Sequence, residues 1–257
     1  MKHLTESLTK RLFFLIFTFA VSYAAMAQMS QKIIVNNFVS DPEEIEVKLL
    51  ISDVDGIGPN IKISIYNEDG RLVYETFETL PEFGKFAFIP SQFQQKFQHG
   101  FNQKPIFNGS IVVESQGGNI IGQFWQMHKK NESRTMTLAI PAGDGSGHEK
   151  LTCQHFVSDK NIDSKLIITN VEGIRPVIVM VKYYADAGGL NASERLTIQP
   201  NSVQSIDVYK SNKGIKLTGT AYIEVVGNGN VSGEYHQKSE KEKYQIILPL
   251  LGVNKIR

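Results

Sequence analysis

The sequence predicts an all-β protein made of two tandem antiparallel β-sandwich domains of immunoglobulin-like size, related by internal duplication. Three observations lead to this prediction. The block at residues 38–59 recurs with conservative exchanges at 156–176. Short runs of alternating apolar and polar residues, separated by turns rich in Gly, Asn and Asp, fill both halves of the chain. Seven or eight such strands in about 110 residues are typical of a β-sandwich.

Residues 1–27 are predicted to be an export signal. Lys10 and Arg11 precede a compact apolar run, and the small residues that end at Ala27 fit a cleavage site. An uncleaved anchor helix is the alternative, but the apolar run is shorter than the about 20 residues that a membrane span needs. We therefore expect the mature chain to begin at Gln28 and to be periplasmic, extracellular or attached to the cell surface.

Composition argues against some partners. The chain has 27 basic and 26 acidic residues and a net charge of +1. Removal of residues 1–27 takes away three basic residues and one acidic residue, which leaves a net charge of −1. A protein so close to neutral has no electrostatic reason to bind nucleic acid or an anionic membrane. The single cysteine, Cys153, lies in an apolar run and is expected to be a buried, unreactive thiol.

Domain 1 is predicted to cover residues 28–142. Apolar and polar side chains alternate over 45–52, as in a strand with one buried face. Residues 61–65 alternate in the same way, and the turn at 67–70 then reverses the chain, because Gly70 tolerates a positive φ. The strands expected after this turn are 71–77, 86–88, 109–115, 120–126 and 135–140.

Domain 2 is predicted to cover residues 150–257, after a small, polar linker at 143–149. This Gly-rich linker is expected to couple the two domains weakly. Residues 177–183 alternate, and a turn at 186–189 follows as in domain 1. The remaining expected strands are 196–198, 206–208, 216–226, 231–237 and 244–248.

An insertion breaks the symmetry of the two halves. Residues 90–105 are longer than their counterpart at 210–214. Phe93, Phe97 and Phe101 recur every four residues, which is consistent with a short helix that lays one aromatic edge on the sandwich. A loop that covers an open edge or end of the sheet is a second interpretation, and an aromatic loop that grips a ligand is a third.

The repeated tetrapeptide Phe-Val-Ser-Asp has a structural interpretation. Phe38 and Phe156 are expected to be buried, because truncation of a buried Phe costs about 3–5 kcal/mol. Asp41 and Asp159 are expected to accept hydrogen bonds from nearby backbone N–H groups, as an Asp after a strand does in a turn.

Each half shows a strand that ends in Asn or Asp, a turn that contains Gly, and a later hairpin that begins at Gly. This order resembles the tandem β-sandwich repeats of exported bacterial proteins. More loosely, residues 196–200, 206–208 and 221–237 resemble the sensory rhodopsin transducer domain, a small β-sandwich. The second resemblance implies binding of partner proteins or small molecules.

No metal, cofactor or catalytic set is predicted. Asp53 and Asp55 suggest a calcium loop, but Ile57 occupies the third ligand position of the helix-loop-helix template and no Glu stands at the twelfth. An inter-strand turn explains both carboxylates. The histidines lack zinc spacing, and the chain has neither a nucleophile elbow nor a phosphate-binding Gly loop. We therefore expect a protein that is not an enzyme.

The candidate ligand-binding residues lie on the late strand of each half. Trp125, Gln126 and His128 occur in the first half, and His236 and Gln237 occur at the equivalent place in the second. An exposed aromatic beside an amide can hold a sugar ring. Since Trp125 should point away from the face of Phe124, core packing or an interdomain contact is the favoured alternative.

The sequence thus predicts an exported, non-enzymatic protein with a structural or protein-interaction role. A carbohydrate or small-ligand binding module is the alternative, and a hydrolytic enzyme is the least favoured reading. The expected partner is a protein or a glycan, whose identity the sequence does not specify.

Overall fold

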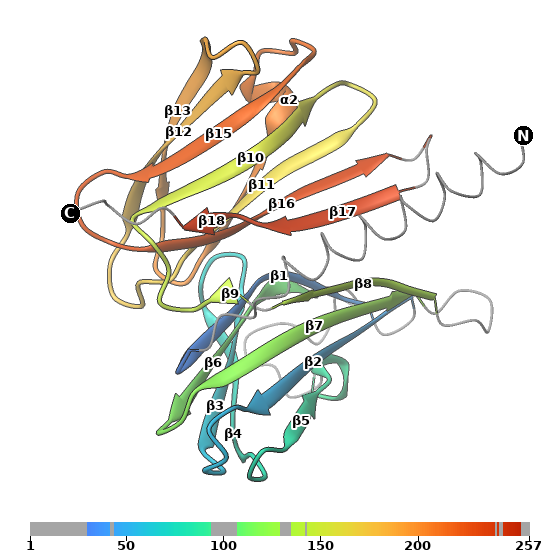
Figure 1. Ribbon diagram of the computed structural model, residues 1–257, viewed down its shortest axis with the longest axis vertical. Coiled ribbons are helices and arrows are strands. Elements are labelled where there is room, and N and C mark those ends of the chain that lie inside the picture. The colour runs from blue at the N-terminus through green and yellow to red at the C-terminus, as the bar shows by residue number, and fades with distance from the viewer. Residues whose placement is uncertain are drawn as a thin grey trace, which may run out of the picture.

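The computed structural model describes residues 30–41, 44–93, 107–128, 135–141, 143–239, 241 and 244–252. Each half of the chain forms one β-sandwich, and the two sandwiches are stacked along the long axis of the molecule (Figure 1). The prediction of an all-β fold with two antiparallel sandwiches is confirmed. Within the described ranges, no helix has the length and apolar character needed to cross a bilayer.

Domain 1 consists of a five-stranded sheet in the order β4-β3-β6-β1-β9 and a four-stranded sheet in the order β5-β2-β7-β8. The 3-10 helix η1 (Pro90–Gln92) follows β5. The strands are β1 (Lys32–Ser40), β2 (Ile45–Asp53), β3 (Asn60–Asn67), β4 (Leu72–Thr79), β5 (Lys85–Phe88), β6 (Phe107–Gln116), β7 (Ile120–His128), β8 (Thr135–Pro141) and β9 (Gly143–Asp144).

Domain 2 has the same two sheets, in the orders β13-β12-β15-β10-β18 and β14-β11-β16-β17. A single helical turn, α2 (Val208–Ser211), takes the place of η1. The strands are β10 (Lys150–Ser158), β11 (Asp163–Asn170), β12 (Val177–Ala185), β13 (Leu190–Ile198), β14 (Val203–Asp207), β15 (Leu217–Val225), β16 (Val231–Ser239), β17 (Tyr244–Pro249) and β18 (Leu251–Gly252).

The two domains also share their strand register. Phe38 on β1 lies opposite Gly109 on β6, and Phe156 on β10 lies opposite Gly219 on β15. An irregularity in the ladder precedes the Phe in both domains. A side chain on either Gly would collide with a carbonyl oxygen of the neighbouring strand. This close approach explains why both positions hold glycine.

The residues of the repeated tetrapeptide have the expected roles. Phe38 and Phe156 are buried in the cores of their domains. Asp41 accepts a backbone N–H three residues ahead at 3.1 Å, and Asp159 accepts one two residues ahead at 2.9 Å. Cys153 is buried as predicted. Burial raises the pKa of its thiol to about 12, so the thiol stays protonated at neutral pH.

An apolar cluster joins the two domains. Ile34 and Val112 lie on the outer face of the five-stranded sheet of domain 1, where they pack with Val171 of domain 2. Tyr66 on β3 borders the same cluster. The outer face of this sheet is therefore partly covered by domain 2.

Polar contacts reinforce this interdomain interface. The Asn36 amide donates to a carboxylate oxygen of Glu234 at 3.3 Å, and the Thr169 hydroxyl donates to the Asn36 carbonyl at 3.3 Å. The backbone N–H of Val203 donates to the Glu68 carbonyl at 3.1 Å. The domains are thus joined by a packed interface and not by the linker alone, contrary to the expectation of weak coupling.

The predicted linker and the insertion are partly described. Within 143–149, strand β9 pairs with β1 and therefore belongs to the sheet of domain 1. Phe93 stacks on Phe88 with ring centroids 5.2 Å apart, and it packs against the domain 1 core. Phe97, Phe101 and residues 1–27 lie outside the described residues.

Candidate functional site

The predicted ligand-binding residues of domain 1 lie on β7. Trp125 pairs with Lys48 of β2 and is half-buried, while its neighbour Phe124 is buried in the core. The expected opposite orientation of these two rings is confirmed. Among the described residues, the buried indole N–H of Trp125 has no hydrogen-bond partner. Gln126 is also half-buried, and the side chain of His128 lies outside the described residues.

The two predicted ligand-binding residues of domain 2, His236 and Gln237, contact other side chains of the same domain. His236 on β16 lies 2.9 Å from a carboxylate oxygen of Glu234, which also contacts domain 1. The carbonyl oxygen of the buried Gln237 side chain accepts the Tyr235 hydroxyl at 2.8 Å. Trp125 and His236 therefore lie on corresponding strands of different sandwiches, and a ligand role for them stays a prediction.

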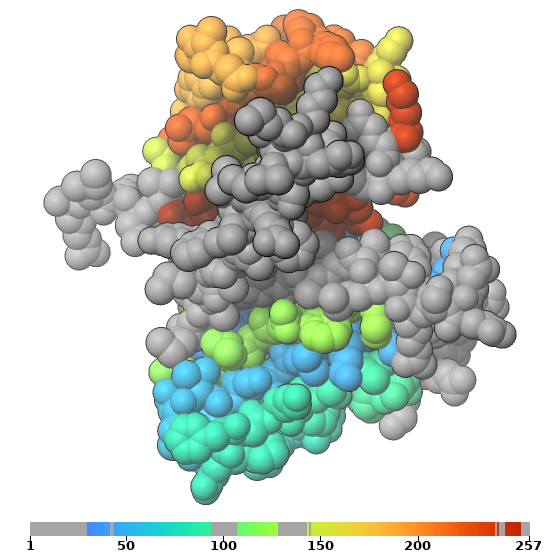
Figure 2. Space-filling model, turned by 45° about the vertical axis from the view of Figure 1, so that its right-hand side comes forward, coloured from blue at the N-terminus to red at the C-terminus, as the bar shows by residue number. Residues whose placement is uncertain are grey.

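A different part of the molecule combines rigidity with exposed apolar side chains. We name the turns 54–59, 80–84 and 117–119 the domain 1 loop end. They connect β2 to β3, β4 to β5 and β6 to β7. This end lies far from domain 2 in both views (Figures 1 and 2). The corresponding turns of domain 2, residues 171–176, 199–202 and 226–230, form the domain 2 loop end.

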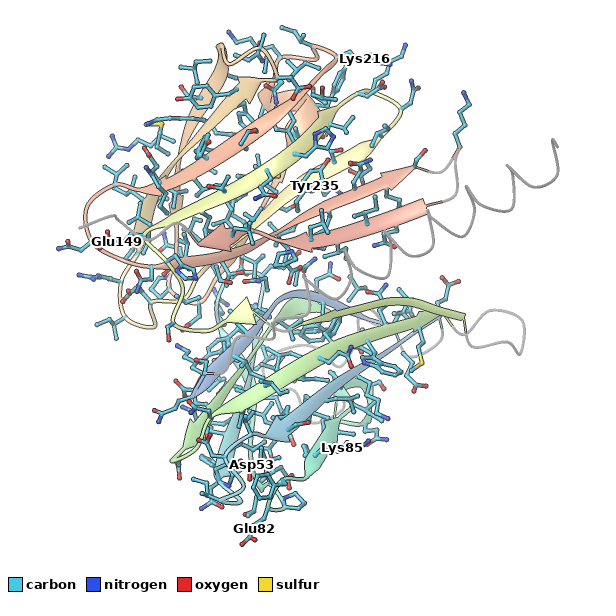
Figure 3. The ribbon with its side chains drawn as sticks, viewed as in Figure 1. Asp53, Glu82, Lys85, Glu149, Lys216 and Tyr235 are labelled. Carbon is cyan, nitrogen blue, oxygen red and sulfur yellow. The ribbon has the colours of Figure 1, made fainter. Side chains whose placement is uncertain are left out.

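Asp53 holds two turns of the domain 1 loop end together (Figure 3). Its buried carboxylate accepts the backbone N–H groups of Asp55, Gly56, Gly58 and Phe83 at 3.0–3.2 Å. Burial by itself would raise the pKa of Asp53, but these donors outweigh it and hold that pKa below its ordinary value. The first turn is thereby fastened to the second.

Two apolar side chains project from this frame. Ile57 is 56% exposed and Phe83 is 77% exposed. Phe83 has a φ of 50°, in the left-handed region, and its ring lies over Gly56, where a side chain would collide with it. Ile57 rests on Gly118 of the third turn. Sequence reasoning missed both, although for Ile57 its position between Gly56 and Gly58 in a turn was a signal of exposure.

The carboxylates proposed and then rejected as calcium ligands have backbone partners. Asp53 is occupied as described above, and Asp55 accepts the backbone N–H of Asn119 at 2.8 Å and its side-chain amide at 3.1 Å. Both carboxylates thus shape the turns, as the alternative interpretation expected. Over the described part of the chain, no group of three or more His, Cys, Asp or Glu side chains is arranged to hold a metal ion.

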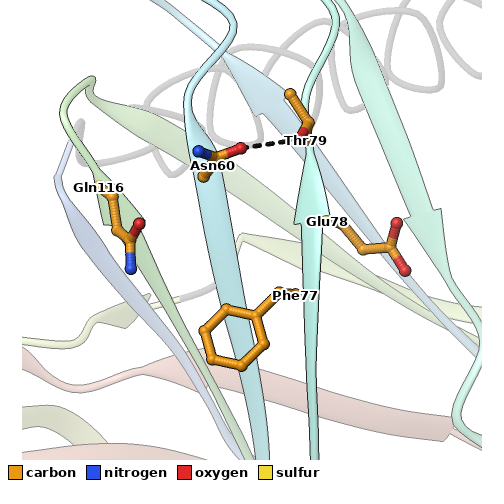
Figure 4. A pocket seen from close by; sticks show the side chains of 5 residues that line it. All are labelled: Asn60, Phe77, Glu78, Thr79 and Gln116. Carbon is orange, nitrogen blue, oxygen red and sulfur yellow. Dashed lines mark hydrogen bonds between the residues drawn. The ribbon is translucent and has the colours of Figure 1, made fainter.

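A shallow hollow of about 330 Å³ lies beside the domain 1 loop end, at the edge of the five-stranded sheet (Figure 4). Phe77 is 60% exposed there, and the amide side chains of Asn60 and Gln116 also line the hollow. The Thr79 hydroxyl donates to the Asn60 amide oxygen at 2.7 Å. A ring with neighbouring amides and a hydroxyl is chemistry that suits a sugar. The outward position of Phe77 in the 71–77 alternation was the signal for it.

The domain 2 loop end differs because it is docked. Val171 is buried against domain 1, whereas its counterpart Val54 is half-exposed. Asn170 stands in the place of Asp53, and within the described part of the chain its side-chain oxygen accepts one backbone N–H, that of Glu172, at 2.8 Å. Its amide group donates to two carbonyl oxygens at 2.9 and 3.0 Å.

The sheet topology places the chain in the broad class of β-sandwich proteins, and comparison with known proteins adds no family to this class. No family model and no curated protein matches the chain. A structure described as a β-galactosidase of Bacteroides fragilis is 11% identical, with a TM-score of 0.16, and covers 84% of this chain and 32% of its own. For β-glucuronidases of Bacteroides uniformis and Parabacteroides merdae, the identities are 10% and 12% and the TM-scores 0.17 and 0.18.

These two alignments cover 82% and 83% of this chain, but only 25% and 26% of the glucuronidases. The chain thus corresponds to between a quarter and a third of the length of these structures. Likenesses with such low TM-scores carry no argument about activity.

Proposed function

We propose that the chain is an exported, non-enzymatic protein whose tandem β-sandwiches have a structural or protein-interaction role. One observation carries the proposal: the domain 1 loop end presents Ile57 and Phe83 to solvent on turns that Asp53 holds in place. Rigid apolar anchors that stand out from a polar surface are what protein interfaces use. Export is supported by the predicted signal at residues 1–27.

The non-enzymatic part of the proposal is supported by what the reactive side chains do. Cys153 is protonated at neutral pH because burial raises its pKa to about 12. Glu234 and His236 contact each other at 2.9 Å, and the same carboxylate ties domain 2 to Asn36. Asp53 is committed to backbone donors. In each case a structural role accounts for the group.

Capture of partners from the exported fraction of the source cells tests this function. Ile57→Ser and Phe83→Ser should lower the affinity for a captured protein at least about tenfold, because loss of an interface anchor has an effect of this size. Ile174→Ser is the matched control, since Ile174 is the domain 2 counterpart of Ile57 and is 89% exposed. Equal capture by all three variants and the wild type would refute the proposed contact surface.

The hollow in Figure 4 favours a second candidate, a carbohydrate-binding module. An array of glycans probed with the protein should then show binding that Phe77→Ala removes, because the ring supplies the stacking surface. Leu72→Ala is the control, since Leu72 lies on the same strand and is also exposed. Binding that survives Phe77→Ala, or no binding to any glycan, would exclude this hollow as a sugar site.

A further inference from the structure

We propose that a second copy of this chain docks its domain 1 loop end onto the free outer face of the five-stranded sheet of domain 2. The contact would repeat, between chains, the interface that joins the two domains within one chain. This inference rests on the proposed interaction role and names the partner. The evidence is a set of equivalent positions in the two domains. At these positions, the residue of one domain lies in the interdomain interface and its counterpart in the other domain lies outside it.

The first pair is the glycine of the hairpin that follows the third strand of each domain. Gly70, between β3 and β4, has a φ of 80°, and Gly188, between β12 and β13, has a φ of 88°. A side chain on Gly70 would overlap the carbonyl oxygen of Pro200 in the domain 2 loop end. Among the described residues, a side chain on Gly188 would meet nothing within 4 Å. The same turn is thus occupied in domain 1 and vacant in domain 2.

The second comparison concerns the outer face of the five-stranded sheet. By strand register, Val112 corresponds to Tyr222 and Tyr66 to Tyr184. Val112 is 8% exposed under domain 2, whereas Tyr222 is 37% exposed. Tyr222 and Tyr184 form an edge-to-face pair with centroids 5.7 Å apart. Leu251 on β18, which β10 separates from Tyr222 in the same sheet, is also exposed. The same face also carries Glu224 with its ion-pair partners Lys150 and Lys182. Domain 2 therefore offers an exposed face of aromatic and charged side chains where domain 1 has a covered one.

The surface that docks differs between the two domains in the complementary way: it is buried in domain 2 and exposed in domain 1. Glu234, on the docked sheet of domain 2, is buried, whereas its register counterpart Gln123 in domain 1 is exposed. Asn201, next to the Pro200 carbonyl that faces Gly70, has a φ of 56°, and its counterpart Phe83 has a φ of 50°. In the repeated contact, Phe83 of the second copy would lie beside the open turn at Gly188.

Charge favours the same contact. In the interdomain interface the Val203 N–H donates to the Glu68 carbonyl. The register counterpart of Val203 is Lys85, and the position equivalent to Glu68 in the β12–β13 turn is Asp186. Both are exposed and of opposite charge. In a contact between chains, Lys85 of one copy would therefore face Asp186 of the other. These are the positions at which the interdomain contact has the Val203–Glu68 backbone hydrogen bond.

The proposed contact is head-to-tail. Figure 1 shows the β12–β13 turn at the top of the molecule and the domain 1 loop end at the bottom. The two surfaces are different, so each copy can dock onto one neighbour and receive another. A heterologous contact of this kind extends into a filament unless its rotation closes a ring.

The average mass of the protein in solution, measured by light scattering or sedimentation as the concentration is raised, tests the inference. The chain is expressed from its first residue, so that the cell determines any cleavage. The mass of the wild type should rise beyond two copies. Phe83→Ser and Gly188→Asn should each stay monomeric, and Asn is chosen because it tolerates a positive φ. The control is Gly227→Asn, at a second open glycine of positive φ, which should assemble like the wild type.

A mixture of the Phe83→Ser and Gly188→Asn variants gives the sharpest outcome. Each retains one intact surface, so the mixture should form a complex of one copy of each and grow no further. A wild type that is monomeric throughout, or a mixture that stays monomeric, would overturn the inference. If the wild type is monomeric while Ile57→Ser still releases a captured exported protein, this inference fails and the proposed function stands.

Discussion

The two loop ends of this protein are built on the same strands and have opposite surroundings. In domain 2 the end is packed against domain 1, with Val171 buried and the Val203 N–H bonded across the interface. In domain 1 the equivalent end leaves Val54 half-exposed and presents Phe83 to solvent. The comparison teaches that the same loop end of one β-unit can be packed against a neighbouring domain in one copy and stay exposed in the other.

The residue at the base of each loop end reflects this difference. Asp53 accepts four backbone N–H groups and so fastens its turn to the neighbouring turn of Phe83. Asn170 accepts one N–H and donates to two carbonyls, in a turn that domain 1 also supports. An acceptor-only carboxylate suits the first arrangement, and an amide suits the second.

The largest expected effect comes from the two equivalent core rings. Phe156→Ala and Phe38→Ala should each lower the free energy of unfolding by about 3–5 kcal/mol, because each leaves a cavity in a packed core. Denaturant unfolding followed by circular dichroism measures this loss. Since the interface couples the domains, Phe156→Ala should also shift the transition of domain 1. An unchanged domain 1 transition would show that the interface contributes little.

The two hairpin glycines provide a smaller and more selective effect. Gly70→Asn should destabilise the protein by roughly 1–3 kcal/mol, because the new side chain must displace Pro200 from the interface. Gly188→Asn should change the stability of the monomer by less than about 0.5 kcal/mol, since its surroundings are open. Thermal melts at low concentration compare the two. Equal losses would mean that backbone strain, and not the interface, sets the effect.

The pH dependence of stability should distinguish Asp53 from Asn170. Because the pKa of Asp53 is lowered in the folded protein, its stabilising contribution is complete above the unfolded value of 3.8. It is lost as the pH falls below 3.8 and through the folded value. Asp53→Asn should remove this acid-dependent component from domain 1, and Asn170→Asp should introduce none of comparable size. The measurement is the melting temperature of each variant between pH 5 and pH 2. If the melting temperature of Asp53→Asn fell with pH as steeply as that of the wild type, the prediction would be wrong.

The features of the fold that the sequence predicts correctly are those that depend on neighbouring residues in the chain. The burial of Phe38 and Phe156, and the turn roles of Asp41 and Asp159, follow from alternation and from side chains that bond to backbone nearby. Strands β9 and β18 have two residues each, too few for an alternating pattern, so β9 fell within the predicted linker. The fold was therefore accessible from the sequence, apart from its shortest elements.

The candidate site was less accessible, because it depends on contacts between distant segments. Asn36 meets Glu234 only once both sandwiches are complete and docked. Trp125 was singled out for its residue type, whereas the backbone of Phe83 is held by an Asp53 carboxylate that lies thirty residues earlier in the chain. No local pattern indicates which of two equivalent loop ends will be covered.

Engineered cysteine pairs test the central claim, that the interdomain contact also forms between chains. Glu68→Cys with Val203→Cys is the reference pair, since their backbones approach to 3.1 Å within one chain. Lys85→Cys with Asp186→Cys occupies the equivalent positions on the two free surfaces. The native Cys153 is buried and should not compete.

After mild oxidation, gel electrophoresis without reductant gives the result. We expect the reference variant to close an intrachain disulfide, and the Lys85→Cys, Asp186→Cys variant to form a ladder of linked chains. A Lys85→Cys, Asp186→Cys variant that stays a single chain, while the reference pair closes, would contradict the account.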